Sequence, residues 1–162
     1  MEFLIEEHAE NISDSEINKL LTNAYVGGGF TTPERAAIIF VSSAVRRRGK
    51  MIVARTADGV FVGMVIAVRP DAPARRMAEP DEAEIHFLAV DSLYRGNGLG
   101  RVLMSKALES IREIGFKKTV LWTQPQMIPA HRLYESMGFV RAHWRDPVFD
   151  GIYFFAYQIE TS

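Results

Sequence analysis

A glycine-rich turn at residues 95–100 is the segment of this sequence best suited to chemistry. It follows a hydrophobic stretch that ends at Val90 and precedes a helical pattern that starts near Gly98. Backbone amides at a helix N-terminus have no partner within the helix and lie at the positive end of its dipole. Glycine also lets an anion approach the main chain closely. We therefore predict that this turn binds a phosphate group.

The spacing within the turn excludes two common kinds of phosphate site. A P-loop needs Lys and then Ser or Thr after its last glycine, whereas Arg101 follows Gly100. A dinucleotide-binding turn reads G-x-G-x-x-G, and its third glycine position is Arg101 when counted from Gly96 and Leu103 when counted from Gly98. The turn therefore fits neither a nucleoside triphosphate site nor a Rossmann site.

Two titratable residues lie on the hydrophobic stretch before the turn. Glu84 and His86 are two positions apart, so the alternation of a strand puts them on the same face. Histidine has a pKa close to neutrality, which makes His86 a candidate proton acceptor. The alternative is that His86 has no catalytic function, because a lone histidine is more commonly just packed or solvent-exposed.

The sequence offers little else that is reactive. It contains no cysteine, which excludes disulfides, thiolate zinc sites and cysteine nucleophiles. Only His131 and Glu135 combine a histidine and an acid at helical i, i+4 spacing, and zinc needs more ligands than that. No G-x-S-x-G motif marks a serine nucleophile. We expect no metal cofactor.

Alternating strand and helix patterns place these residues in a single domain over residues 1–162. Ser13–Glu16 reads as a helix start, as does Thr32 followed by Pro33. Arg46–Arg48 is interpreted as a solvated helix end rather than a binding patch. Residues 69–82 are interpreted as a variable surface loop rather than the border of a substrate entrance. An Asp-Gly pair predicts a hairpin turn at residues 58–59 and another at 150–151. The predicted order is β-α-α-β-β-β-α-β-α-β-β, with strands at 3–8, 51–56, 60–68, 83–90, 118–123, 139–144 and 152–159, and helices from 13, 33–46, 98–114 and 129–137.

Bulk composition restricts the partners. The 162 residues include 19 Lys and Arg against 20 Asp and Glu, so the chain lacks a broad attraction for nucleic acid or an anionic membrane. The first residues are acidic where a signal peptide would be basic, and no apolar run approaches about 20 residues. We expect a cytoplasmic protein that binds neither nucleic acid nor membrane.

Two motifs resemble those of the GNAT superfamily of acetyltransferases. Arg95-x-x-Gly98-x-Gly100 matches its pyrophosphate-binding pattern R/Q-x-x-G-x-G/A. About thirty residues on, Ala130-x-x-Leu133-Tyr134-Glu135-x-x-Gly138-Phe139 is similar to its A-x-x-L-Y-E-x-x-G-F segment. The resemblance implies an α/β (α+β) fold with a mixed, mainly antiparallel central sheet of about seven strands flanked by about four helices.

The resemblance also implies acetyl-CoA as cosubstrate and assigns residues to it. The main chain at Leu88, Ala89 and Val90 matches the part of the family's strand that contacts the pantetheine arm. An amide near Leu88 would polarise the thioester carbonyl. The residues matching the pyrophosphate turn are Arg95, Gly96, Asn97, Gly98, Leu99, Gly100 and Arg101.

Catalytic residues follow from the same resemblance. An amine with a pKa of ~10.4 is neutral in only about one molecule per thousand at pH 7, so a base is needed. Glu84 aligns with the general base of the family's histone-type members, which read A-E-I-x-F where this chain has residues 83–87. His86 or a water relay is the alternative, and Tyr134 aligns with the tyrosine that serves as general acid. The family often has asparagine where this chain has Met127, and Gln124 or Gln126 are candidate substitutes.

The acceptor predicted first is the amine of a small molecule, attacked directly in a ternary complex. A peptide or protein amine is the alternative, followed by a non-catalytic acyl-CoA-binding module. The aromatic strand at 152–159 suggests a possible homodimer. Candidates for the acceptor wall are Tyr25, Gly27 to Phe30, Trp122, Trp144 and Tyr153.

Overall fold

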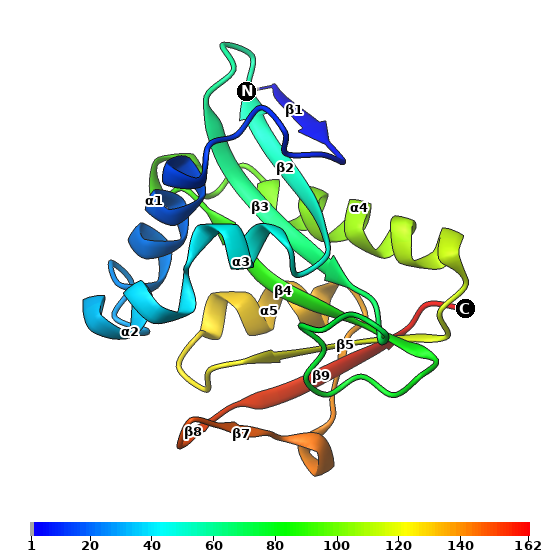
Figure 1. Ribbon diagram of the computed structural model, residues 1–162. Coiled ribbons are helices and arrows are strands. Elements are labelled where there is room, and N and C mark those ends of the chain that lie inside the picture. Colours follow the sequence, from blue (N-terminus) through cyan, green and yellow to red (C-terminus); the bar gives the residue numbers. More distant parts are fainter. Residues whose placement is uncertain (1) are drawn as a thin grey trace.

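The computed structural model describes residues 2–162 as a seven-stranded sheet with helices on both faces (Figure 1). Every neighbouring pair of strands is antiparallel except β4 and β5, which run parallel. The strands follow the order β1 (Phe3–Glu6), β2 (Lys50–Thr56), β3 (Phe61–Val68), β4 (Glu82–Val90), β5 (Lys118–Thr123), β9 (Phe155–Glu160) and β6 (Val140–Arg141). The predicted fold class is confirmed, although five helices form where about four were expected.

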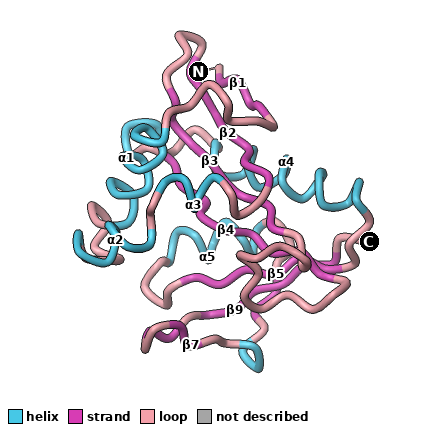
Figure 2. The backbone as a smooth tube through the Cα atoms, viewed as in Figure 1, coloured by secondary structure: helices cyan, strands magenta, loops and turns pink. Residues whose placement is uncertain are grey.

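Two hydrophobic clusters cover the two faces of the sheet, because side chains alternate along each strand. On β2, Ile52 and Ala54 pack with α4 and α5, whereas Met51 and Val53 pack with α1, α2 and α3. The interior strand β3 is buried along its whole length. The helices are α1 (Asp14–Tyr25), α2 (Pro33–Ile39), α3 (Ser42–Arg46), α4 (Leu99–Ile114) and α5 (Ile128–Ser136), and Figure 2 shows how the loops join them.

The single helix predicted over residues 33–46 is wrong, since the chain forms α2 and α3 instead. Phe40 lies between them with non-helical backbone angles (φ −98°, ψ 38°). Its side chain is 2% exposed, and its ring packs against Tyr25 and Phe87 at centroid distances of 5.3 Å. Asn18 on α1 donates to the Phe40 carbonyl oxygen at 2.9 Å. Burial of the Phe40 ring and this hydrogen bond stabilise the break in the helix.

The C-terminal hairpin also differs from the prediction. Only Val140–Arg141 of the predicted 139–144 strand is extended, and it pairs with β9. The turn at residues 150–151 instead joins a separate short pair, β7 (Val148–Phe149) and β8 (Ile152–Tyr153). The Asp146 carboxylate accepts hydrogen bonds from both terminal nitrogens of Arg141 and from the Ala156 amide. These bonds hold the intervening residues away from the main sheet.

Replacement of Ser13 by alanine should lower the free energy of unfolding by about 1 kcal/mol. Ser13 caps α1 in a capping box, in which its Oγ accepts from the Glu16 amide at 3.1 Å and the Glu16 carboxylate accepts from the Ser13 amide at 3.0 Å. Chemical denaturation of wild type and Ser13→Ala measures the change. Ser13→Thr should retain most of the stability, and an equal loss in both variants would contradict the capping explanation.

Candidate active site

A cavity of about 720 Å³ opens where β4 and β5 separate. The two strands pair only from Glu82 to Glu84 and from Lys118 to Val120. Beyond these residues β4 stays paired with β3, whereas β5 stays paired with β9. Figure 1 shows the two strands diverging, with α5 seen between them. The fold thus produces a cleft in the middle of the sheet.

A β-bulge in β4 faces this cavity. Met64 of β3 lies opposite Ala89, but Ile66 lies opposite His86, so β4 carries an extra residue between them. Phe87 has φ 51°, which is rare for a residue with a side chain. A bulge takes backbone groups out of the ladder and redirects them. Leu88 lies in this bulge and lines the cavity, so its main chain is placed to meet a ligand.

The glycine turn borders the same cavity. Gly96 and Gly98 have φ of 81° and 75°, the left-handed region that glycine adopts readily. Gly98 is the N-cap of α4 and provides no side-chain cap. The amides of residues 99–101 are therefore free of helical partners, and all three residues line the cavity. This arrangement can bind an anion at the positive end of α4.

The structure brings almost all of the predicted site residues together. Glu84 and Asn97 are the exceptions among them, since neither lines the cavity. Asn97 is exposed, and its side chain donates to the Tyr94 carbonyl oxygen at 3.0 Å, which stabilises the turn from outside. The predicted residues that line the cavity are His86, Leu88, Ala89, Val90, Arg95, Gly96, Gly98, Leu99, Gly100, Arg101 and Tyr134.

Glu84 is fully buried beneath the cavity, and its carboxylate is surrounded by donors. The amides of Arg76 and Ala78 donate to Oε1 at 2.9 and 2.6 Å, and the Met77 amide donates to the same atom. His86 Nε2 lies 2.7 Å from Oε2. Burial acts to raise the pKa of Glu84, but the hydrogen bonds from His86 and from the backbone amides outweigh it and hold the pKa below its usual value. Glu84 is therefore a buried anion and a weak base.

His86 is held by a partner at each ring nitrogen. Its Nδ1 lies 2.9 Å from Nη1 of Arg48, which can only donate, so Nδ1 is the acceptor and Nε2–H donates to Glu84. Burial, together with the charges of Arg48 and Arg76, lowers the pKa of His86, and the hydrogen bond and charge of Glu84 offset this only in part. His86 is consequently a neutral imidazole on the wall of the cavity, which is the protonation state that a general base requires.

Tyr134 reaches the cavity from α5. Its side chain is buried, and its ring packs against Phe139 and Tyr157 at centroid distances of 5.8 and 6.0 Å. Burial raises the pKa of the Tyr134 hydroxyl well above its usual value. The phenol therefore stays protonated over the physiological range and can donate a hydrogen bond.

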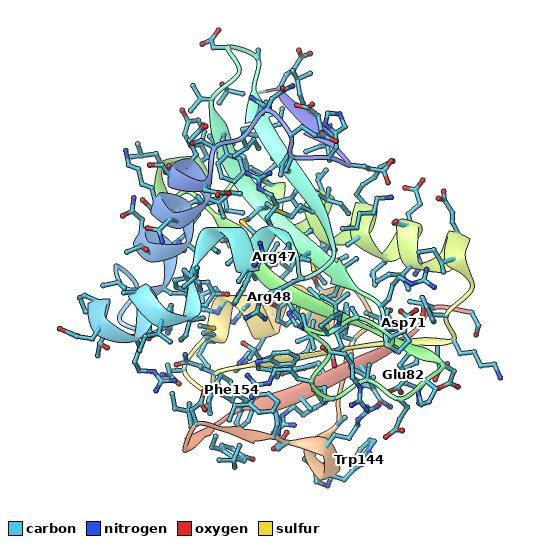
Figure 3. The ribbon with its side chains drawn as sticks, in the orientation of Figure 1. Arg47, Arg48, Asp71, Glu82, Trp144 and Phe154 are labelled. Atoms are coloured by element: carbon cyan, nitrogen blue, oxygen red, sulfur yellow. The ribbon has the colours of Figure 1, made fainter. Side chains whose placement is uncertain are left out.

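The predicted acceptor wall is only partly correct. Tyr25, Phe30 and Trp122 line the cavity, but Gly27–Gly29, Trp144 and Tyr153 do not. Trp144 is 66% exposed because it follows the short β6 outside the main sheet. Figure 3 shows Trp144 at the lower edge of the molecule, whereas Arg48 lies near its middle.

The interpretation of Arg46–Arg48 as a solvated helix end is also wrong for two of the three residues. Arg46 binds Asp14 at 3.1 Å and donates to the carbonyl oxygen of Ala9 at 2.8 Å. Arg48 lines the cavity, whereas Arg47 is exposed. The loop residue Arg76 also lies on the cavity wall and was not predicted. An irregular loop has no periodicity, so its sequence does not indicate which side chains face the cavity.

The position at which the family often has asparagine lies on the cavity. Met127 and Gln124 both line it, whereas Gln126 is exposed and does not. The Gln124 amide donates to the Phe30 carbonyl oxygen at 2.8 Å, and its oxygen accepts from Gln126 at 2.7 Å. Gln124 is therefore the available substitute, although its amide is already bonded within the protein.

The fold and the site define a class of α/β protein in which a cavity between two separating strands connects an uncapped helix N-terminus with a neutral histidine. Comparison with known families specifies which one. Residues 15–139 match the Acetyltransferase (GNAT) family, and the chain belongs to that family. Among residues 2–162 no helix is long and apolar enough to cross a membrane, and no group of three or more His, Asp or Glu side chains could hold a metal ion.

Individual relatives agree with this assignment. N-acetylaspartate synthetase of Xenopus tropicalis is 38% identical over 82 residues, which is 51% of this chain and 28% of that protein. Mycothiol acetyltransferase of Thermomonospora curvata is 41% identical over 58 residues, which is 36% of this chain and 20% of that protein. The chain thus matches less than a third of the length of either relative.

Solved structures share the fold over nearly the whole chain. A GNAT-family acetyltransferase of Staphylococcus aureus superimposes with a TM-score of 0.81 at 15% identity, covering 99% of this chain and 100% of the other. A Bacillus subtilis acetyltransferase in complex with CoA gives 0.69 at 19% identity, covering 98% and 99%.

Proposed function

We propose that this protein transfers the acetyl group of acetyl-CoA to the primary amine of a small molecule, by direct attack in a ternary complex. The observation that carries the proposal is a single cavity lined by the uncapped α4 turn, the β4 bulge, His86 and Tyr134. An anion site, an exposed main chain, a proton acceptor and a proton donor are the groups that this transfer needs.

Acetyl-CoA supplies a thioester whose carbonyl carbon is open to attack by an amine. The amides of residues 99–101 would bind its pyrophosphate, and Arg95 and Arg101 are placed to add charge-assisted contacts. The bulged main chain of β4 would lie along its pantetheine arm. The amide near Leu88 would donate to the carbonyl oxygen as negative charge develops there, an interaction typically worth about 3 kcal/mol.

His86 is our candidate for the base. It would accept the ammonium proton at Nδ1 while Nε2–H stays bonded to Glu84, whose buried negative charge stabilises the imidazolium that forms. Arg48 must move off Nδ1 for this step, because the two groups are 2.9 Å apart. Glu84 acts through His86 and is a positioning residue in this scheme, which departs from its assignment as the base itself.

Tyr134→Phe should reduce kcat by about 10- to 100-fold while changing the Kd of acetyl-CoA by less than about threefold. The phenol would donate to the departing thiolate sulfur, and its raised pKa keeps it protonated for that purpose. Release of coenzyme A thiol, measured against acceptor concentration, gives kcat. Phe139→Leu, which alters the neighbouring ring without touching a hydroxyl, is the matched control, and an equal loss there would mean that Tyr134 acts by packing.

The same thiol-release assay tests the function as a whole. Purified protein with acetyl-CoA and a panel of primary amines should release thiol and yield an acetylated amine detectable by mass spectrometry. Saturable binding of acetyl-CoA without release for any amine would instead favour a non-catalytic acyl-CoA-binding module. Labelling of lysate polypeptides by radioactive acetyl-CoA would favour a peptide or protein acceptor.

The first rank given to a small-molecule acceptor is supported by two matched relatives, which are named for N-acetylaspartate and for mycothiol. A homodimer, a cytoplasmic location and the absence of nucleic-acid binding stay predictions from the sequence.

A further inference from the structure

Among the charged side chains on the cavity wall, arginines outnumber acids. Asp150 is the only Asp or Glu of residues 2–162 that lines it. Two of the lining arginines, Arg95 and Arg101, belong to the glycine turn. The others come from separate elements, namely Arg35 on α2, Arg48 after α3, and Arg76 in the loop before β4.

Some arginines of the protein pair with a carboxylate and others do not, and the last three belong to the second group within the described residues. Five other arginines of the protein have a carboxylate oxygen within 4.0 Å of a guanidinium nitrogen. Within residues 2–162, neither Arg35, Arg48 nor Arg76 has such a partner. The buried Nε of Arg35 lacks any hydrogen-bond partner. The cavity therefore holds guanidinium groups whose charge the protein itself does not pair.

Aromatic rings hold two of these guanidinium groups in place. Arg48 lies over the Phe87 ring at 4.4 Å, and Arg76 lies over the Phe149 ring at 3.9 Å. A guanidinium stacked on a ring keeps its edge donors available for a planar anion. Burial lowers the pKa of Arg48, and the charge of Arg76 lowers it further, so the two groups are close enough to repel each other. An anion bound between them would relieve that repulsion.

The charge around this region fits one negative group. Apart from Arg95 and Arg101 at the glycine turn, the wall contributes three positive charges from Arg35, Arg48 and Arg76 and one negative charge from Asp150. The buried Glu84 adds a second negative charge behind His86, which leaves one positive charge when His86 is neutral. Figure 3 shows Arg48 beside β4, near the middle of the molecule. A single carboxylate is therefore a better match than a dianionic phosphate.

We infer that the acceptor is a small amine that carries a carboxylate close to its amino group, as an amino acid does, and that Arg48 and Arg76 bind this carboxylate. The inference rests on the proposed acetyl transfer and specifies its acceptor. Arg48 Nη1 is 2.9 Å from His86 Nδ1, so a carboxylate on Arg48 brings a neighbouring amine next to the candidate base. The same contact would draw Arg48 away from Nδ1 and free that nitrogen for the proton.

The test compares each proteinogenic L-amino acid with its carboxamide in the thiol-release assay, using the full chain. The carboxamide keeps the amine and the side chain and removes only the negative charge. For the best acceptor, kcat/KM should fall by about 10- to 100-fold in the carboxamide. Arg48→Met should reduce this preference to within about threefold, and Arg47→Met, which alters the adjacent exposed arginine, should retain it.

The ratio of kcat/KM for the amino acid to kcat/KM for its carboxamide separates carboxylate recognition from catalysis. Damage to the base would slow the reaction of both acceptors and leave this ratio unchanged. If Arg48→Met lowers the melting temperature, Arg76→Met provides an independent test, because Arg76 is an exposed loop residue. This variant should also reduce the preference for the amino acid over its carboxamide. Carboxamides or decarboxylated amines that react as fast as the amino acids would overturn the inference and leave acetyl transfer standing. Saturable acetyl-CoA binding with no thiol release for any amine would overturn the proposed function and this inference with it.

Discussion

Gly98→Asp should weaken binding of acetyl-CoA by about 100-fold or more, because it puts a carboxylate beside the amides that would bind the pyrophosphate. Like charges placed together at an interface cost several kcal/mol, which corresponds to at least that factor in Kd. Gly98 has φ 75°, and a Cβ built on it meets no atom within 4 Å, so the added group points into open space. Calorimetric titration of acetyl-CoA measures the effect.

Gly98→Asn is the matched control for this substitution. Asparagine has nearly the same size as aspartate and tolerates the left-handed backbone region equally well, but it carries no charge. Its Kd should stay within a few-fold of wild type if the turn binds an anion. Equal losses in both variants would point to distortion of the turn, and wild-type affinity in both would contradict the assignment of the pyrophosphate site.

The parts of the site that the sequence predicted are those determined by local geometry. The turn at residues 95–100 requires positive φ at Gly96 and Gly98, and only a short stretch of sequence is needed to encode it. The placement of Glu84 and His86 on one strand face is confirmed by their 2.7 Å contact, since alternation along a strand is also local.

The parts that the sequence did not predict depend on contacts between distant segments. Residues 76–78 lie in what was read as a variable surface loop, yet their amides surround the Glu84 carboxylate. Arg48 was grouped with its two arginine neighbours, but the turn after α3 directs it to His86. Neither contact follows from a periodic pattern in the sequence, so each can be identified only from the folded structure. The helix break at Phe40 has the same origin, because packing against Phe87 overrides helix propensity.

His86→Gln should reduce kcat by about 100-fold or more and should change the shape of the pH profile. Glutamine can still donate to Glu84, but an amide cannot accept a proton. In the wild type the base must be neutral, and burial lowers the pKa of His86. The rate should therefore be at its plateau at pH 7 and should fall only as the pH drops below the ordinary histidine value of about 6.5.

In His86→Gln the amine must enter already neutral. The residual rate should then rise with pH up to the pKa of the acceptor amine, so the limb that ends near the histidine pKa is replaced by one that extends to the amine pKa. His143→Gln, at an exposed position away from the cavity, should keep the wild-type profile. A wild-type limb that persists in His86→Gln would assign proton removal to another group. The Glu84 carboxylate is already filled by donors and its pKa is lowered, so a limb near the histidine value would not belong to Glu84.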